Sequence, residues 1–147
     1  MTTKTFAVER AIRIRARREE VFALLSSRED FATWMPVTIL EPRVGGNVEF
    51  RFDRETGGEI VAFGEITAYD APSRISFTWD FKDDPLDART EVTIDLTPDG
   101  DATVVRLTHI GFIDDEEAAK HAQGWEHWLG RLKARREGDY HADDRSV

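Results

Sequence analysis

Apolar and polar residues alternate along several stretches of the chain, and a period of two is typical of strands that bury one face. In 48–53, for example, Val48, Phe50 and Phe52 share one side of the strand. The same alternation predicts strands over 6–15, 59–69, 74–81, 91–97 and 103–110. It is blurred in 59–69, where a bulge near Gly64 would shift its phase.

Helical periodicity is found between and after these strands. Segments 19–25 and 28–34 predict two short helices after the first strand, the second ended by Pro36. Asp114 with Glu117 resembles a capping pair, and Gly138 suits a helix end. Between them the apolar positions follow the spacing of an amphipathic helix. These positions are Ala118, Ala122, Trp125, Leu129 and Leu132.

The order of these elements predicts the fold. Strands joined by short turns, such as those at Gly45-Gly46 and Gly57-Gly58, form an antiparallel meander, and the long helix must cover its apolar face. We therefore expect an α+β helix-grip fold, with a curved antiparallel sheet of about six to seven strands wrapped around a long C-terminal helix and two short helices after the first strand. One domain is expected over 1–137, and a polar, disordered tail over 138–147.

Composition narrows the classes of function. The chain has 147 residues, 40% of them hydrophobic, which is enough for a core without disulfides. It has no cysteine, which excludes disulfides, thiolate metal sites and a cysteine nucleophile. Acidic runs at 80–87 and 114–117 offset the basic runs at 10–18 and 131–136, and the net charge is −9. This balance disfavours a nucleic-acid partner.

The distribution of apolar residues predicts neither a membrane span nor a secretory signal. No stretch approaches the ~20 apolar residues that a membrane span needs. Residues 1–17 contain no continuous apolar run of the kind found in a secretory signal. We therefore expect a cytoplasmic protein with no membrane span.

Inward-facing aromatic residues are the main candidates for a ligand site. Strand parity places Phe50, Phe77 and Trp79 on the inner face, opposite Trp125 and Trp128 of the long helix. We expect Trp34 near an opening and Leu107 on the inner face of the last strand. Such a cluster could line an apolar cavity, and it could equally well fill the core.

Three polar residues are further candidates. His109 shares the inward side of its strand with Leu107, and His121 shares a helix edge with Trp125. Each histidine could orient a ligand or act as an acid or base, or could tie a strand end to the helix. Arg10, on the inner side of the first strand, could pair with an acidic ligand or with Glu65, or could extend to the sheet edge.

No established catalytic or cofactor motif is found. His121 and His127 are six positions apart and do not share a helix face as metal ligands would. There is no nucleophile triad and no phosphate-binding loop, since both glycine pairs lie between strands. We therefore predict no catalytic residues, no metal and no cofactor.

Several segments together resemble a known family. They include EPRVGGNVEFRF, GEITAYDAPSRISFTW, VTIDLTPDGDATVVRLTHIGF and HAQGWEHWLGRL. In this order they resemble the START/Bet v 1-like superfamily, and specifically its branch named after the activator of Hsp90 ATPase. The resemblance runs from about residue 5 to residue 136. Arg18 departs from it, where the family usually has proline, and so does Met35, where a second tryptophan is common.

The resemblance and the residues leave three functions open. The first is non-catalytic binding of a small hydrophobic or amphipathic molecule between the sheet and the long helix. The second is a chaperone-binding role, which the family name implies. The third is an enzyme of the cyclase or hydratase type, as some superfamily members are, with His109, His121 and Arg10 supplying its polar groups.

Overall fold

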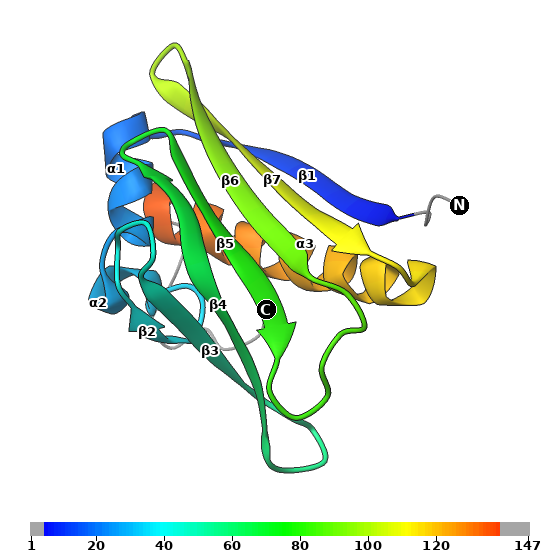
Figure 1. The fold of residues 1–147 in the computed structure, drawn as a ribbon. Coiled ribbons are helices and arrows are strands. Elements are labelled where there is room, and N and C mark those ends of the chain that lie inside the picture. The colour runs from blue at the N-terminus through cyan, green and yellow to red at the C-terminus, as the bar shows by residue number, and fades with distance from the viewer. Residues whose placement is uncertain (1–4, 139–147) are drawn as a thin grey trace.

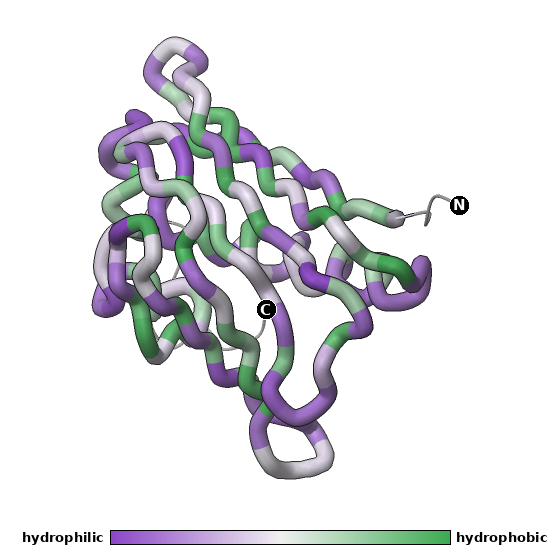
Figure 2. The backbone as a smooth tube through the Cα atoms, viewed as in Figure 1, coloured by the Kyte–Doolittle hydropathy of each residue, from purple (hydrophilic) through white to green (hydrophobic). Residues whose placement is uncertain are grey.

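The structure is a computed structural model and describes residues 5–138. It contains a seven-stranded sheet with the order β1-β7-β6-β5-β4-β3-β2, in which every neighbouring pair is antiparallel (Figure 1). The strands are β1 (Phe6–Ile14), β2 (Val37–Leu40), β3 (Asn47–Asp53), β4 (Glu59–Asp70), β5 (Arg74–Phe81), β6 (Thr90–Asp99) and β7 (Ala102–Phe112). Apolar and polar residues alternate along these strands, as Figure 2 shows. The predicted α+β helix-grip fold is confirmed.

Two short helices follow β1, as predicted. Helix α1 (Arg18–Phe22) continues into a 3₁₀ turn (Ala23–Leu25), and α2 (Arg28–Phe31) follows. Ser27 caps α2, because its hydroxyl accepts a hydrogen bond from the backbone N–H of Asp30. These helices bury their apolar side chains at one end of the sheet and close that end of the core.

Two details of the sheet differ from the sequence prediction. The edge strand β2 was not predicted, because only four residues form it and they do not alternate. The bulge in β4 lies between Ile66 and Ala68, beyond Gly64. Gly64 instead allows a close approach of two strands, since a Cβ there would lie 1.7 Å from the carbonyl oxygen of Thr78.

A bulge at the end of β7 turns two aromatic side chains inward. The pairing of β1 with β7 shifts between Phe6 and Val8, and Gly111 has a φ of 101°. This conformation favours glycine. As a result His109 and Phe112, three residues apart, are both buried, with ring centroids 4.4 Å apart.

The long helix α3 (Asp115–Glu137) runs behind the curved sheet in Figure 1, close to β1 and β7. Asp114 caps it, accepting from the backbone N–H of Glu116, and Gly138 ends it in a left-handed conformation. The predicted capping pair is therefore half correct, because the Glu117 carboxylate turns toward Lys120 and His121. Of the predicted tail, residues 139–147 lie outside the described residues.

The core fills the space between the sheet and α3. Buried side chains of α3 are Ala118, Trp125, Leu129 and Leu132, which are predicted positions of its apolar stripe. The largest fully buried side chains include Trp34, Phe31, Phe50, Phe77, Phe112 and Leu107. Aromatic rings of the core contact one another, for example those of Phe31 and Trp34, whose centroids are 4.7 Å apart. The middle of the fold is thus packed with protein side chains.

Candidate functional site

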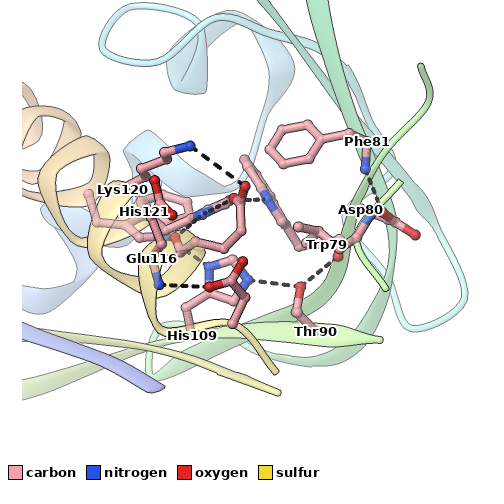
Figure 3. Close-up of polar contacts among 12 residues, drawn as sticks. Trp79, Asp80, Phe81, Thr90, His109, Glu116, Lys120 and His121 are labelled. Carbon is pink, nitrogen blue, oxygen red and sulfur yellow. Dashed lines mark hydrogen bonds and ion pairs between the residues drawn. The ribbon is translucent and has the colours of Figure 1, made fainter. Parts of the chain in front are cut away.

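His109 lies at the centre of a buried hydrogen-bonded chain (Figure 3). Trp125 Nε1 donates to His109 Nδ1 at 3.0 Å. His109 Nε2 lies 2.9 Å from Thr90 Oγ1, which donates to the carbonyl oxygen of Trp79 at 2.6 Å. Because an indole N–H can only donate, Nδ1 must be the acceptor and Nε2 must carry the proton. This series of hydrogen bonds therefore fixes the tautomer of His109 and joins α3, β7, β6 and β5.

His121, on α3, forms a second pair with the opposite tautomer. Trp79 Nε1 donates to His121 Nε2 at 3.2 Å, and His121 Nδ1 lies 2.8 Å from the carbonyl oxygen of Glu117. Nδ1 therefore carries the proton here. The two imidazole rings lie 5.2 Å apart between centroids and almost perpendicular, at 89°. Each histidine thus has a tryptophan partner from another element.

Both histidines are neutral at pH 7. Burial, together with the neighbouring His121, lowers the pKa of His109 to about 2. Burial also lowers the pKa of His121, against the opposing effect of the Glu117 carbonyl and carboxylate. All four ring nitrogens have protein partners. The arrangement orders the fold and leaves no ring nitrogen of these histidines free for a substrate.

A groove opens beside this pair, between α3 and the ends of β3, β4 and β5. Its volume is about 280 Å³. The residues that line it are Phe52, Ile60, Trp79, Phe81, Glu117, Lys120, His121, Gly124, Trp125 and Trp128. Only Glu117 and Lys120 among them carry a formal charge, and the rest present rings, an aliphatic side chain and helix backbone. Such a surface suits an apolar molecule.

Two other hollows adjoin the groove. One, of about 390 Å³, shares Ile60, Phe81 and Glu117 with it and extends to the loop after β5. The other, of about 840 Å³, shares Phe52 and Trp128 and lies between the segment that follows α2, the end of β3 and α3. A molecule longer than the groove could therefore extend in either direction.

Comparison with known proteins gives the family. Residues 15–137 match the family described as activator of Hsp90 ATPase homolog 1-like protein. The chain belongs to this family. The match covers every element after β1, and it confirms the resemblance predicted from the sequence. No curated protein matches the chain.

Solved structures share the family's fold. Protein CV1439 from Chromobacterium violaceum is 24% identical, with a TM-score of 0.77 over 90% of this chain and 96% of that one. An Aha1 dimer from Colwellia psychrerythraea is 21% identical, with a TM-score of 0.74 over 90% and 96%. DynU16, from the dynemicin biosynthetic locus, is 19% identical, with a TM-score of 0.76 over 90% and 48%. These likenesses concern the fold alone.

Four of the residues that the sequence predicts for a ligand site line the groove. They are Trp79, His121, Trp125 and Trp128. Phe50, Phe77 and Leu107 are instead buried core residues. The ring of Phe50 lies beneath Trp79, at 5.4 Å between centroids, so the core supports the groove from below. His109 is buried one layer beneath His121 and does not line the groove.

Trp34 and Arg10 do not line the groove. Trp34, expected near an opening, is 1% exposed and donates from Nε1 to the carbonyl oxygen of Leu24 at 2.8 Å. It forms part of the wall of the larger hollow but its ring belongs to the core. Arg10 lies at the sheet edge, where its Nε is 2.8 Å from Glu126 Oε1 of α3. Its suggested partner, Glu65, is exposed on β4.

Phe52, Ile60, Phe81 and Gly124 line the groove but were not predicted for the site. Phe52 alternates in phase with Phe50, and Phe81 with Phe77 and Trp79, so following strand parity to the strand ends would have found both. Gly124 gives no such signal, because a glycine has no side chain whose periodicity can be followed.

Residues 5–138 contain no group of three or more His, Cys, Asp or Glu side chains placed to hold a metal ion. Within the same residues, no helix is both long and apolar enough to span a bilayer.

Proposed function

We propose that this protein binds a small apolar or amphipathic molecule in the groove between α3 and the ends of β3–β5, without catalysing a reaction on it. The observation that carries the proposal is the groove itself, which has a volume of about 280 Å³, is lined mainly by aromatic side chains and lies on a packed core. Ligand sites are typically about 300–1,000 Å³, so a small ligand or one that extends into an adjoining hollow is expected.

The saturated histidines support binding without catalysis. A general acid or base must reach a substrate proton, and His109 and His121 already use every ring nitrogen within the protein. Arg10, the third polar residue considered for an enzyme, pairs with Glu126 and does not line the groove. The groove therefore offers contact area and shape, with Glu117 and Lys120 as its charged groups.

A chaperone-binding role would need a contiguous exposed apolar surface. The exposed large apolar side chains of the described chain lie on several elements, and they are Ile39, Val44, Phe63, Ile110 and Ile113. One solved relative is an Aha1 dimer and another comes from a biosynthetic locus, so the relatives do not choose between chaperone binding and small-molecule binding. The groove favours small-molecule binding.

The experiment is a thermal-unfolding screen against fatty acids, flavonoids, sterols, polyketide-like aromatics and phospholipids. A ligand of the folded state raises the Tm in a concentration-dependent way. We expect one class to do so for the wild type and to lose most of the effect in Trp128→Ala, which removes a half-buried groove ring. Phe63→Ala is the matched control, because it removes an exposed ring outside the groove. A flat response to the whole panel, or an effect that survives Trp128→Ala unchanged, contradicts the proposal.

A further inference from the structure

Helix α3 contains two interior glycines, Gly124 and Gly130. Glycine is the least favourable residue after proline inside a helix, because its backbone loses the most conformational freedom. Tight packing against a glycine would justify that cost. Neither glycine is tightly packed, since a Cβ at either position would meet no neighbouring atom within 4 Å. The fold alone therefore requires neither glycine.

The surroundings of the two glycines differ. Gly130 is exposed to solvent and does not line the groove. Gly124 lines the groove, between His121 one turn earlier and Trp128 one turn later. A side chain at Gly124 would project into space that the groove leaves open, whereas one at Gly130 would project into water.

The walls around Gly124 are aromatic. Trp125 and Trp128 flank it on α3, and Trp79 and Phe52 come from the sheet. The rings of Phe52 and Trp128 lie 5.7 Å apart between centroids, and those of Trp79 and Trp125 lie 5.4 Å apart. Aromatic rings favour offset-stacked and edge-to-face contacts with other aromatic rings. Bare helix backbone surrounded by aromatic rings is a suitable floor for a flat molecule.

We infer that Gly124 is the specificity-determining position of the groove, where its missing side chain lets a planar aromatic ring lie against the helix backbone. The inference rests on the proposed binding function and names the class of ligand, a planar aromatic molecule. A puckered, saturated ring of the same skeleton is thicker, so it makes poorer contact with the helix backbone and the surrounding rings.

The test uses 2-naphthol and decahydro-2-naphthol, which share a carbon skeleton and a hydroxyl group and differ in flatness. Each is titrated by amide NMR into the wild type, Gly124→Ala and the matched control Gly130→Ala. We expect 2-naphthol to bind the wild type and Gly130→Ala equally, and Gly124→Ala at least tenfold more weakly. The saturated compound should bind the wild type at least tenfold more weakly than 2-naphthol does.

Both alanine variants should unfold about 2–4 °C above the wild type, because alanine favours the helix, so weaker binding cannot be ascribed to misfolding. Equal affinity of 2-naphthol for Gly124→Ala and the wild type overturns the inference and leaves the binding function standing. Equal affinity of the flat and puckered compounds does the same. Failure of 2-naphthol to bind the wild type also overturns the inference, and the broader ligand panel then decides on the binding function separately.

Discussion

At the scale of single residues, two tryptophan donors are each matched to one histidine acceptor. An indole offers one N–H, and a neutral imidazole offers one acceptor and one donor. Trp125 and Trp79 donate to the acceptor nitrogens of His109 and His121, and Thr90 and the Glu117 carbonyl accept from the remaining imidazole N–H groups. Full pairing is what makes such buried polar groups stabilising, because an unpaired one costs free energy.

Thr90→Val tests this chain of hydrogen bonds. The change keeps the shape of the side chain but leaves His109 Nε2–H and the Trp79 carbonyl without their partner. Each of these two buried groups left unpaired costs about 1–3 kcal/mol, so we expect a loss of about 2–6 kcal/mol in the free energy of unfolding, measured with urea. Thr108→Val is the control, because the side chain of this half-buried neighbour of His109 forms no hydrogen bond within residues 5–138. Equal losses in the two variants would contradict this account.

The same histidines predict how stability depends on pH. The pKa of His109 is about 2 in the folded protein, below its ordinary value of 6.5, so the unfolded chain binds more protons between these values. The contribution of His109 to the free energy of unfolding is therefore fully present above about pH 6.5 and falls as the pH is lowered through this window. At pH 5 the loss from His109 is about 2 kcal/mol, with a further loss from His121, whose pKa is also lowered.

This pH effect is measured by urea unfolding at pH 7, 6 and 5, together with NMR of the imidazole rings. The His109 ring should keep the spectrum of the neutral form at pH 5 while stability falls. Lys82, Thr38 and Arg51 lower the pKa of Glu49 to about 2, so its contribution is lost only as the pH falls below about 4.5. Unchanged stability between pH 7 and 5, or a His109 ring that titrates near 6.5, would show that the predicted shift is absent.

At the scale of elements, the ends of α3 matter as much as its apolar stripe. Asp114 accepts from the Glu116 N–H, and three acidic residues occupy the first turn, where the helix dipole favours negative charge. At the other end Lys133 lowers the pKa of Glu137 to about 2, with Arg15 of the turn after β1 contributing further hydrogen bonds. The helix is thus held at both ends while its middle faces the groove.

Asp114→Ala should reduce the free energy of unfolding by about 1 kcal/mol, the usual cost of losing an N-cap. Asp115→Ala is the control, since it removes the same charge one position later, in the first turn, without removing the cap bond. Urea unfolding of the two variants separates the hydrogen bond from the charge. A cap worth nothing would give the same unfolding midpoint in both variants.

Most elements could be predicted because their periodicity is long and uninterrupted. Strand β5 alternates over its length, and α3 keeps its apolar stripe through Leu132. Strand β2 was missed because four residues at a sheet edge, with only Val37 buried, hold too short a pattern. The β4 bulge was assigned to Gly64 because glycine is common at bulges, whereas that position is required for close approach to Thr78.

At the scale of the whole molecule, the groove exists because α3 runs close to β1 and β7 at one margin of the sheet, while β3 and β4 lie toward the other. Parity predicted which rings face inward. It could not distinguish Phe50, which is covered on all sides, from Phe52, which lies two residues nearer the strand end and meets open space. That difference is set by where the helix crosses the sheet, a tertiary property that no local pattern contains.

The four tryptophans allow the most direct test of the groove as the binding site. Trp79, Trp125 and Trp128 line the groove, and Trp34 is buried with its indole N–H bonded to Leu24. In ¹⁵N-labelled protein each gives its own indole N–H signal. On titration with the compound class that raises the Tm, we predict that the three groove signals shift saturably and further than the Trp34 signal does. If none of the groove signals shifts, or if Trp34 shifts further than they do, the ligand does not lie in the groove and the central claim is wrong.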